Sequence, residues 1–234
     1  MLTRSTSQVR ILVAVCALLV LACAGLAIAA SNMGFKVVKP IVIAGSGSIG
    51  DNWTALPFKN PYANVGVFCN KVGLITAVLG RASITVLNEN TGGFQTVSCG
   101  TSQADALTLI AGKGIKIRQP PATGAPTNII IAGSHDNNLQ IVIPKAGSGQ
   151  IGNFWFSVPY HTTYTTAADL CQNGNLSPGP VPAAASITRL NASTGALVTA
   201  NCGSAQASAL MLQFGEFVQI RDPGGPKTFT PSHY

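Results

Sequence analysis

Two glycine motifs have the most familiar chemical spacing in this chain. Gly45-Ser-Gly-Ser-Ile-Gly50 follows a β-branched run, and Gly147-Ser-Gly-Gln-Ile-Gly152 repeats it. The pattern G-x-G-x-x-G is that of a dinucleotide-binding turn, which requires a helix whose N-terminal amides face the pyrophosphate. Both motifs instead run into strand-like residues that stop at Pro57 and at Pro159, which leaves no room for that helix. We therefore predict turns between strands and no cofactor.

Groups suited to catalysis or metal binding are sparse. The chain has three histidines and seven acidic residues, and it lacks an H-E-x-x-H motif, a Cys/His cluster and a nucleophile elbow. His135-Asp136 could ligate a metal, but a solvated turn explains this pair better. We therefore predict a protein that is not an enzyme and has no catalytic, cofactor-binding or metal-binding residues.

Aromatic residues gather in two segments of the chain. An exposed shelf of rings could stack on sugars or contact a partner, whereas buried rings would form the core under a helix, which is their more common use. The sequence leaves both uses open. The rings that could form a ligand or partner surface are Trp53, Tyr62, Trp155, Tyr160 and Tyr164.

The strongest pattern in the chain is a tandem repeat. Matching residues recur 102 or 103 positions apart and in the same order, which indicates two homologous units of one module. The clearest matches are 56–58 with 158–160, Tyr62 with Tyr164, Cys69 with Cys171, 83–85 with 186–188, Cys99 with Cys202, and 117–118 with 220–221.

Local patterns within each unit are mostly those of strands. β-branched runs cover residues 36–43, 129–131 and 139–143, and the polar stretch 134–138 predicts a hairpin turn between the last two. Two further hairpins are predicted around 88–93 and 191–195, with a glycine at the end of each loop. One short helix per unit is expected, at 165–171 and, from less regular residues, at 62–71.

The expected fold is therefore mainly β, with a minor α+β character. It consists of two tandem homologous domains, sandwich-like or barrel-like, each with about one short helix and one disulfide. The predicted boundaries are a signal peptide at 1–30, a first β-rich repeat domain at 31–121, a Pro-rich linker at 122–127 and a second β-rich repeat domain at 128–234. The linker is uncharged and Pro-rich, which predicts a semi-rigid connection.

The first 30 residues have the pattern of an export signal. Arg4 and Arg10 precede an apolar run that ends in small residues, as in a secretory signal peptide cleaved near residues 29–31. The 20-residue run is also long enough for an uncleaved anchor, and Cys23 lies in a poor lipoprotein motif. We expect a secreted, extracellular or cell-surface protein, with the bacterial periplasm as an alternative, and membrane contact only through this segment.

The composition changes once this segment is removed. The whole chain is 47% hydrophobic and only 9% charged, which excludes a disordered protein. Without Arg4 and Arg10, 12 basic residues face 7 acidic ones, a net charge of +5. The basic residues are scattered singly, so we expect no nucleic-acid partner.

Four of the six cysteines lie beyond residue 30. Their spacing includes no C-x-x-C pair, and cysteines in an exported chain favour disulfides over metal ligation. Four cysteines allow three connectivities. The equivalence of the two units favours Cys69–Cys99 and Cys171–Cys202, one bridge in each unit.

These motifs also resemble a known module. The order Asn-Trp-x-x-Leu-Pro-Phe/Tyr, Tyr-x-x-Ala-x-Asp-Leu-Cys, Ser-Ile-Thr and Gly-x-x-x-x-Ile-Arg resembles a tandem module of uncharacterised exported bacterial proteins. The second copy carries it best, at 158–160, 164–171, 186–191 and 215–221, whereas the first departs at 65–68. The resemblance implies a β-rich extracellular or surface module and transfers no activity.

Two functions are predicted from these observations. The first is a non-enzymatic secreted or cell-surface structural or adhesive protein, and one form of this hypothesis is a subunit of an extracellular assembly with copies of itself or with other surface proteins. In this hypothesis an edge strand pairs with another subunit through the stretch that carries Phe35, Val37, Ile41 and Ile43. The alternative is an extracellular carbohydrate-binding module that uses the aromatic residues. A secreted hydrolase ranks third among the hypotheses, because the sequence contains no catalytic motif that would support it.

Overall fold

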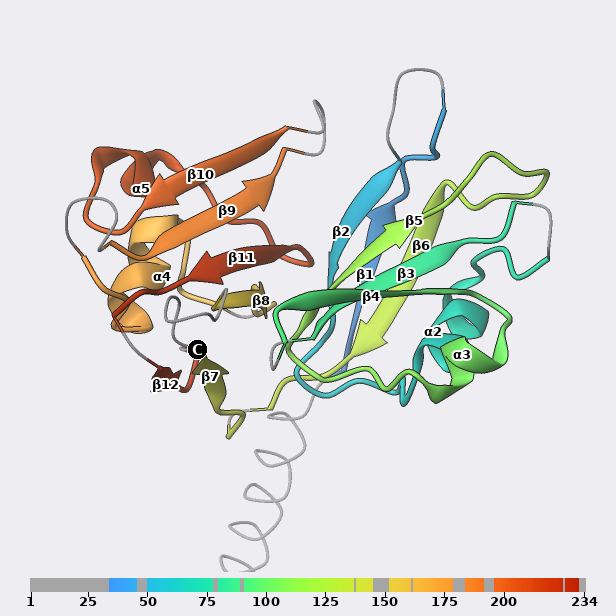
Figure 1. Ribbon diagram of the computed structural model, residues 1–234, viewed down its shortest axis with the longest axis horizontal. Helices are drawn as coiled ribbons and strands as arrows, with labels where there is room; N and C mark the ends of the chain where they lie inside the picture. Colours follow the sequence, from blue (N-terminus) through green and yellow to red (C-terminus); the bar gives the residue numbers. More distant parts are fainter. Residues whose placement is uncertain are drawn as a thin grey trace, which may run out of the picture. The chain divides into compact units, whose positions relative to one another are not determined.

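Two similar sets of strands and helices make up the fold (Figure 1). The computed structural model describes residues 34–231 except 46–49, 78–79, 89–90, 137, 145–151, 161, 179–183, 192–195 and 225. The predicted signal peptide, residues 1–30, lies outside the described residues. Residues 35–234 form one compact unit.

The first half contains a four-stranded antiparallel sheet in the order β2-β5-β3-β4 and a two-stranded ribbon, β1-β6. Its elements are β1 (Phe35–Pro40), β2 (Asp51–Ala55), α2 (Val65–Val72), β3 (Ser83–Asn88), β4 (Gly93–Ser98), α3 (Ser102–Ala106), β5 (Gly114–Arg118) and β6 (Asn128–Gly133).

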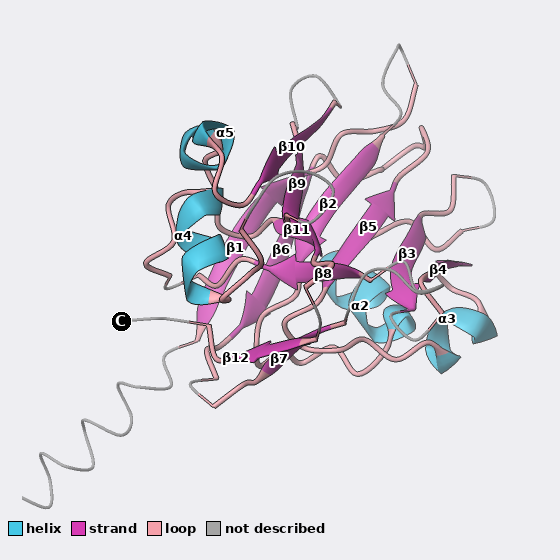
Figure 2. Ribbon diagram, turned by 60° about the vertical axis from the view of Figure 1, so that its left-hand side comes forward, coloured by secondary structure: helices cyan, strands magenta, loops and turns pink. Residues whose placement is uncertain are grey.

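The second half repeats this plan with the sheet β10-β9-β11-β8 and the ribbon β12-β7. Its elements are β7 (Ile141–Ile143), β8 (Asn153–Ser157), α4 (Ala167–Asn173), β9 (Ser186–Leu190), β10 (Leu197–Asn201), α5 (Ala205–Ala209), β11 (Phe217–Arg221) and β12 (Lys227–Phe229). The prediction of two similar, mainly β halves is confirmed. Each half carries two short helices beside its own sheet, one more than the sequence predicts (Figure 2).

The two ribbons correct one predicted hairpin. Residues 129–131 and 139–143 do not pair with each other across 134–138; β6 pairs with β1, and β7 pairs with β12. The reason is burial, because Ile129 and Ile131 enter the first core whereas Ile141 and Ile143 enter the second. Residues 128–133 therefore pair within the first half, although the predicted linker precedes them.

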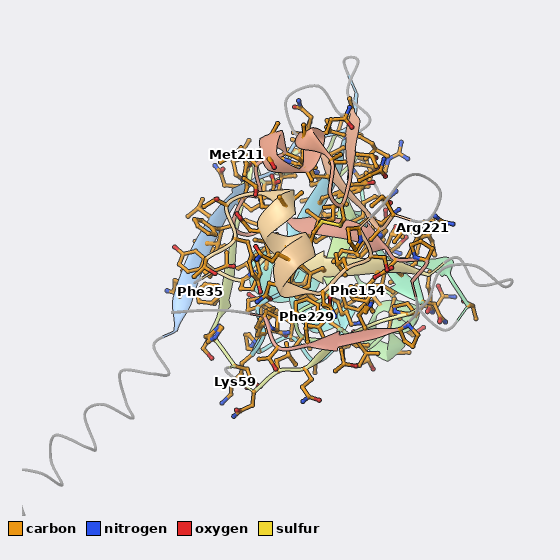
Figure 3. The ribbon with its side chains drawn as sticks, turned by 90° about the vertical axis from the view of Figure 1, so that its left-hand side faces the viewer. Phe35, Lys59, Phe154, Met211, Arg221 and Phe229 are labelled. Atoms are coloured by element: carbon orange, nitrogen blue, oxygen red, sulfur yellow. A yellow bond between two sulfur atoms is a disulfide. The ribbon has the colours of Figure 1, made fainter. Side chains whose placement is uncertain are left out.

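Each half has its own hydrophobic core, and the principal helix of each half lies against it. Val65, Phe68 and Cys69 of α2 are buried in the first core, and Ala167 and Leu170 of α4 are buried in the second. The side chain of Phe154, at the start of β8, is fully buried inside the second half (Figure 3).

Helix α2 forms despite its unfavourable Val and Gly residues. The Asn64 side chain accepts a hydrogen bond from the Val67 N–H at 2.8 Å, which caps the N-terminus. Gly73 ends the helix in the left-handed conformation with φ 75°. Caps at both ends and a buried face offset the weak intrinsic propensity of the helix.

Both predicted disulfides are confirmed. Cys69–Cys99 and Cys171–Cys202 each join the principal helix of one half to the segment that follows its outer hairpin. The bridges close loops with sequence separations of 30 and 31. By the loop-entropy model each adds on the order of 3.5 kcal/mol to stability.

The two halves exchange equivalent backbone hydrogen bonds. The Ala55 N–H donates to the Gly215 carbonyl at 3.1 Å, and the Ser157 N–H donates to the Gly112 carbonyl at 3.1 Å. Ala55 and Ser157 occupy matching positions of the repeat, as do Gly112 and Gly215. The halves therefore meet through an approximate two-fold relation, as the subunits of a symmetric dimer do.

Aromatic rings fill the centre of this contact. The Phe217 ring stacks on Trp53 at a centroid distance of 4.4 Å and on Trp155 at 4.7 Å. Gly114 occupies the position that matches Phe217 in the first half, and a Cβ atom there would lie 2.1 Å from Phe217 Cγ. The packing therefore departs from the two-fold relation at this point. The second half supplies the ring, and the first half supplies the space for it.

The substitution Gly114→Ala should destabilise the protein by roughly 1–3 kcal/mol, because the new methyl group overpacks the contact between the halves. Urea denaturation of the oxidised protein measures this change. Gly93→Ala is the matched control, since its Cβ would meet only Thr91 Oγ1 at 3.3 Å, and it should change stability by less than about 0.5 kcal/mol. Equal stability of the two variants would show that Gly114 is not needed for this packing.

Candidate functional site

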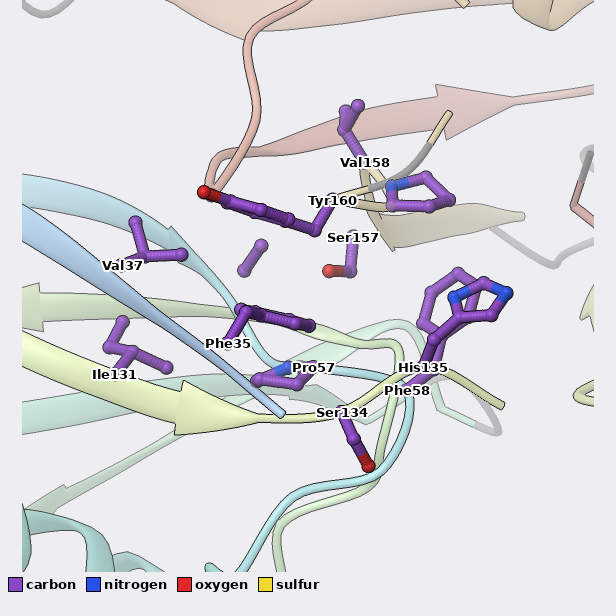
Figure 4. Close-up of a pocket in the computed structure, with 13 residues that line it drawn as sticks. Phe35, Val37, Pro57, Phe58, Ile131, Ser134, His135, Ser157, Val158 and Tyr160 are labelled. Atoms are coloured by element: carbon purple, nitrogen blue, oxygen red, sulfur yellow. The ribbon is translucent and has the colours of Figure 1, made fainter. Parts of the chain in front are cut away.

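A small cavity lies between the two halves where Phe35 of β1 stacks on Tyr160 (Figure 4). The two rings are parallel within 6° and their centroids are 4.4 Å apart. Residues from matching positions of both halves line it, among them Ala55 with Ser157 and Pro57 with Pro159. Its volume of about 20 Å³ is enough for about one water molecule. The cavity is too small for a sugar or a nucleotide.

A short row of aromatic rings extends from this cavity to the surface. Tyr160 contacts Phe214 at a centroid distance of 6.0 Å, and Phe214 is exposed. Phe35 marks the β1 end of the row at the molecular surface (Figure 3). The sequence analysis named Tyr160 for a ligand surface but missed Phe214, because Phe214 has no aromatic counterpart in the first half.

Three of the five aromatic residues predicted to form a ligand surface are buried: Tyr62, Trp155 and Tyr164. Tyr62 Oη accepts a hydrogen bond from the Ala132 N–H at 2.8 Å, and Tyr164 Oη donates to Asn173 Oδ1 at 2.6 Å. Burial raises the pKa of Tyr62, and the hydrogen bond from Ala132 acts in the opposite direction. The expected shelf of rings is therefore not formed by these residues.

The remaining two predicted rings, Trp53 and Tyr160, are half-buried. Trp53 stacks on Phe217, and Tyr160 stacks on Phe35. Each ring thus has a protein partner on one face. Their positions indicate that they hold the two halves together, which is the packing use of aromatic residues that the sequence left open.

The predicted edge strand exists, but its named side chains face inward. Phe35 stacks on Tyr160, and Val37 approaches Gly215, whose Cβ would lie 3.0 Å from Val37 Cγ1. Ile41 is buried, and Ile43 forms a bridge with Gln119. Phe35, Val37 and Ile41 are thus covered by the protein itself, and Ile41 and Ile43 lie beyond the end of β1 at Pro40.

The open side of β1 is the edge that faces away from β6, and it presents the backbone N–H and C=O groups of every second residue. Among the described strands β1 pairs only with β6. The Ala132 N–H points to Tyr62, away from β1, so Ala132 and its neighbour Lys36 form a non-hydrogen-bonded pair. By the antiparallel alternation, the N–H and C=O of Val38 also point away from β6. Pro40 has the same orientation, and a proline without N–H suits such an edge.

Exposed apolar side chains recur at matching positions of the two halves. Val38 on β1 is 63% exposed and Val142 on β7 is 54% exposed. Phe94 on β4 is 62% exposed and Leu197 on β10 is 60% exposed. Ile130, opposite Val38 in the ribbon, is exposed as well. The repeat aligns Phe94 with Leu197, 103 positions apart, and Val38 and Val142, 104 positions apart, lie on β1 and β7 of the two ribbons. Only the strand pairing reveals which side of each strand is open.

A charged cluster fixes the inner face of β1 to the second half. Lys39 Nζ lies 3.1 Å from Glu216 Oε1, and Arg189 lies 3.5 Å from Glu216 Oε2. The three side chains are 11–15% exposed. Arg189 also donates to the Met211 carbonyl. Because the ions are mostly buried and come from both halves, breaking one partner would leave a charge unpaired.

Comparison of the chain with family models, with curated proteins and with solved structures finds no match. The resemblance to a module of exported proteins therefore stays a prediction. Over the part of the chain that the structure describes, no helix is long and apolar enough to span a bilayer. The same residues contain no group of three or more His, Cys, Asp or Glu side chains that could hold a metal ion.

Two open hollows lie on either side of α4. One, of about 500 Å³, lies between α4 and α5 beside the Cys171–Cys202 disulfide. The other, of about 370 Å³, lies beside Thr163 and Asp169. Gln172 lines both of them. The geometry of this face depends on α4, which begins at a capping box.

The capping box sets the charge state of Asp169. Its carboxylate accepts hydrogen bonds from the N–H groups of Thr165 and Thr166 and from the Thr165 hydroxyl. Burial alone would raise the pKa of Asp169, but these hydrogen bonds together lower it below its ordinary value of 3.8. A lowered pKa in the folded state means that the ionised carboxylate stabilises the fold above the unfolded-state pKa.

This contribution should be lost as the pH falls through the folded-state pKa of Asp169. Asp169→Asn should lower the free energy of unfolding by about 0.3–1 kcal/mol at neutral pH, because it removes a negative charge near a helix N-terminus, and the difference from the wild type should shrink below about pH 4. Urea unfolding across this range measures it. Asp136→Asn, which alters a loop carboxylate, is the control. A difference for Asp169→Asn that does not change with pH would contradict the role of its charge.

Proposed function

We propose that this chain is an exported, non-enzymatic structural or adhesive protein that assembles with further copies of itself through the open edge of β1. The observation that carries the proposal is the pairing of an open strand edge with an exposed apolar face. Val38 and Ile130 lie side by side on that face, and the Val38 backbone groups point to the open side. Strand addition uses both features: main-chain hydrogen bonds give affinity, and alternate side chains give specificity.

The compartment supports the proposal. Two disulfides at matching positions indicate an oxidising environment, and the predicted signal peptide agrees with export. A protein of this kind needs a durable surface and no catalytic centre.

The repeat supports self-association over a single contact with another protein. Each chain carries two ribbons of the same design, β1–β6 and β7–β12. The first has six residue pairs and the second has three, so the β1 edge is the longer template. The contact that we propose joins the β1 edges of two copies, so that the β7–β12 ribbon takes no part in it; a contact between like edges is isologous.

Replacing Val38 by Lys should weaken the assembly at least tenfold, which corresponds to about 1.4 kcal/mol per contact. A charge on an edge strand opposes the approach of a second strand, and the exposed position lets the monomer fold. The measurement is analytical ultracentrifugation of the oxidised protein without residues 1–30, with electron microscopy of the same samples.

The repeat provides the control variant. Val142→Lys changes the matching exposed valine on the shorter ribbon and should leave the assembly nearly intact. Hydrogen exchange gives an independent readout: the Val38 amide should be protected in the assembly and open in the Val38→Lys monomer. A wild-type protein that stays monomeric at high concentration would refute self-assembly. An equal loss for both variants would refute the assignment to β1.

A further inference from the structure

We propose that the exposed side of α4, together with the start of α5, binds a neutral glycan. The site is the hollow of about 500 Å³ between the two helices. This volume lies within the usual range for small-ligand sites, unlike the cavity of about 20 Å³ between the halves. The inference does not depend on the proposed assembly, because α4 and α5 belong to neither ribbon.

The matching place in the first half has a different pair of residues between its helices. There Asp105 of α3 packs against Gly66 of α2, so that a Cβ atom on Gly66 would lie 1.9 Å from Asp105 Oδ1. The matching residues in the second half are Ala168 and Ser208, and both line the hollow. The longer side chain of Asp105 is thus replaced by the shorter one of Ser208, and Gly66 is replaced by the larger Ala168.

The polar groups around the hollow are uncharged donors and acceptors. Gln172 and Asn175 line it from α4 and the turn beyond, and Ser204 and Ser208 line it from α5. A side-chain amide both donates and accepts hydrogen bonds, as a hydroxyl does. Such groups match the neighbouring hydroxyls of a sugar, which also donate and accept.

One amide beside the hollow is already oriented. Asn173 lines the adjoining hollow of about 370 Å³, which shares Gln172, and its Oδ1 accepts the hydrogen bond from Tyr164 Oη at 2.6 Å. The buried tyrosine holds the amide in place, so a ligand would meet a fixed group. A fixed group lowers the entropy cost of binding. A chain of sugars across both hollows would contact all three amides of this helix end.

Asn175 is held in a conformation that favours glycine. Its φ is +48°, and it is the one non-glycine residue with positive φ among those that the structure describes. The first half has Gly73 at the matching position, with φ +75°. After glycine, Asn is a usual residue for this conformation at the end of a helix. The retained amide lies at the rim of the hollow, where it can contact a ligand.

The surrounding charges favour a neutral ligand over an anionic one. No Lys or Arg is among the residues that line either hollow. Asp169 is the only acidic one, and its carboxylate is engaged in the capping box. The floor includes Leu176 and the Cys171–Cys202 disulfide, an apolar surface that suits the C–H face of a sugar ring. A phosphate or an acidic polysaccharide would find no cation.

The test is an NMR titration of the oxidised protein with a panel of neutral oligosaccharides: gluco-, manno-, galacto- and N-acetylglucosamine oligomers at millimolar concentration. An acidic oligosaccharide, oligogalacturonate, serves as the charged comparison. We expect at least one neutral oligomer to shift the amide signals of α4 and α5, and oligogalacturonate to leave them unchanged. No shift with any neutral oligomer overturns the proposal, as does a stronger response to the acidic one.

The decisive variant is Asn175→Gly. It removes the amide and adopts the residue of the first half, so the protein should be as stable as the wild type or more stable. Affinity for the neutral oligomer should fall about 3- to 10-fold, the loss of about one hydrogen bond. Gln172→Ala should have a similar effect, whereas Asn70→Ala, at the position that matches Gln172 in the first half, should have none. Binding that is unchanged in both Asn175→Gly and Gln172→Ala overturns the site.

Discussion

The packing of Phe217 between Trp53 and Trp155 is the contact on which the rest of the structure depends. The ring occupies space that only a glycine at position 114 leaves open. Two bulky residues at positions 114 and 217 would clash, and two glycines would leave a cavity. This one asymmetric pair therefore makes two similar halves fit each other as a single unit. The equivalent backbone hydrogen bonds between the halves, and the small cavity between the halves, follow from that fit.

The repeat also separates what the module requires from what one half has gained. Features at matching positions have the same role in both halves: the disulfides, and the half-buried threonine pairs Thr85–Thr96 and Thr188–Thr199, whose hydroxyls are 2.8 Å apart in each case. Features at positions that differ are particular to one half. Ser208 lines a hollow in the second half, whereas its counterpart in the first half, Asp105, lies against Gly66. An internal repeat thus serves as its own comparison, since the two copies share one chain and one set of conditions.

The sequence predicts those parts of the fold that depend on neighbours along the chain. The hairpins β3–β4 and β9–β10 have turn residues and β-branched strands close together, and the cysteine pairs follow from the alignment of the repeats. The ribbons were predicted wrongly because β1 and β6 are separated by almost the whole first half. The sequence also did not indicate which tyrosines are buried. Tyr62 and Tyr160 are the same residue type, but Tyr62 is buried beneath a helix, whereas Tyr160 only stacks on another ring. Phe58, although it belongs to the first half by sequence, is buried in the second core.

The way in which β1 is held explains why its open edge can act as a template. On one side it bonds to β6, and on its inner face Phe35 and Lys39 are fixed by Tyr160 and Glu216 of the second half. A strand held on two of its sides has already lost its conformational freedom, so an incoming strand bears only its own ordering cost. Most edge strands are short, charged or bent, which prevents such pairing. Here the exposed Val38 and Ile130 lie on the outward face, where Lys36 and Pro40 of β1 are exposed as well, whereas Lys39 is turned inward to Glu216. The contact between the halves therefore does more than join them: it holds β1 in place and turns one of its two lysines inward, so that Lys36 is the charged residue of β1 that remains on the outward face.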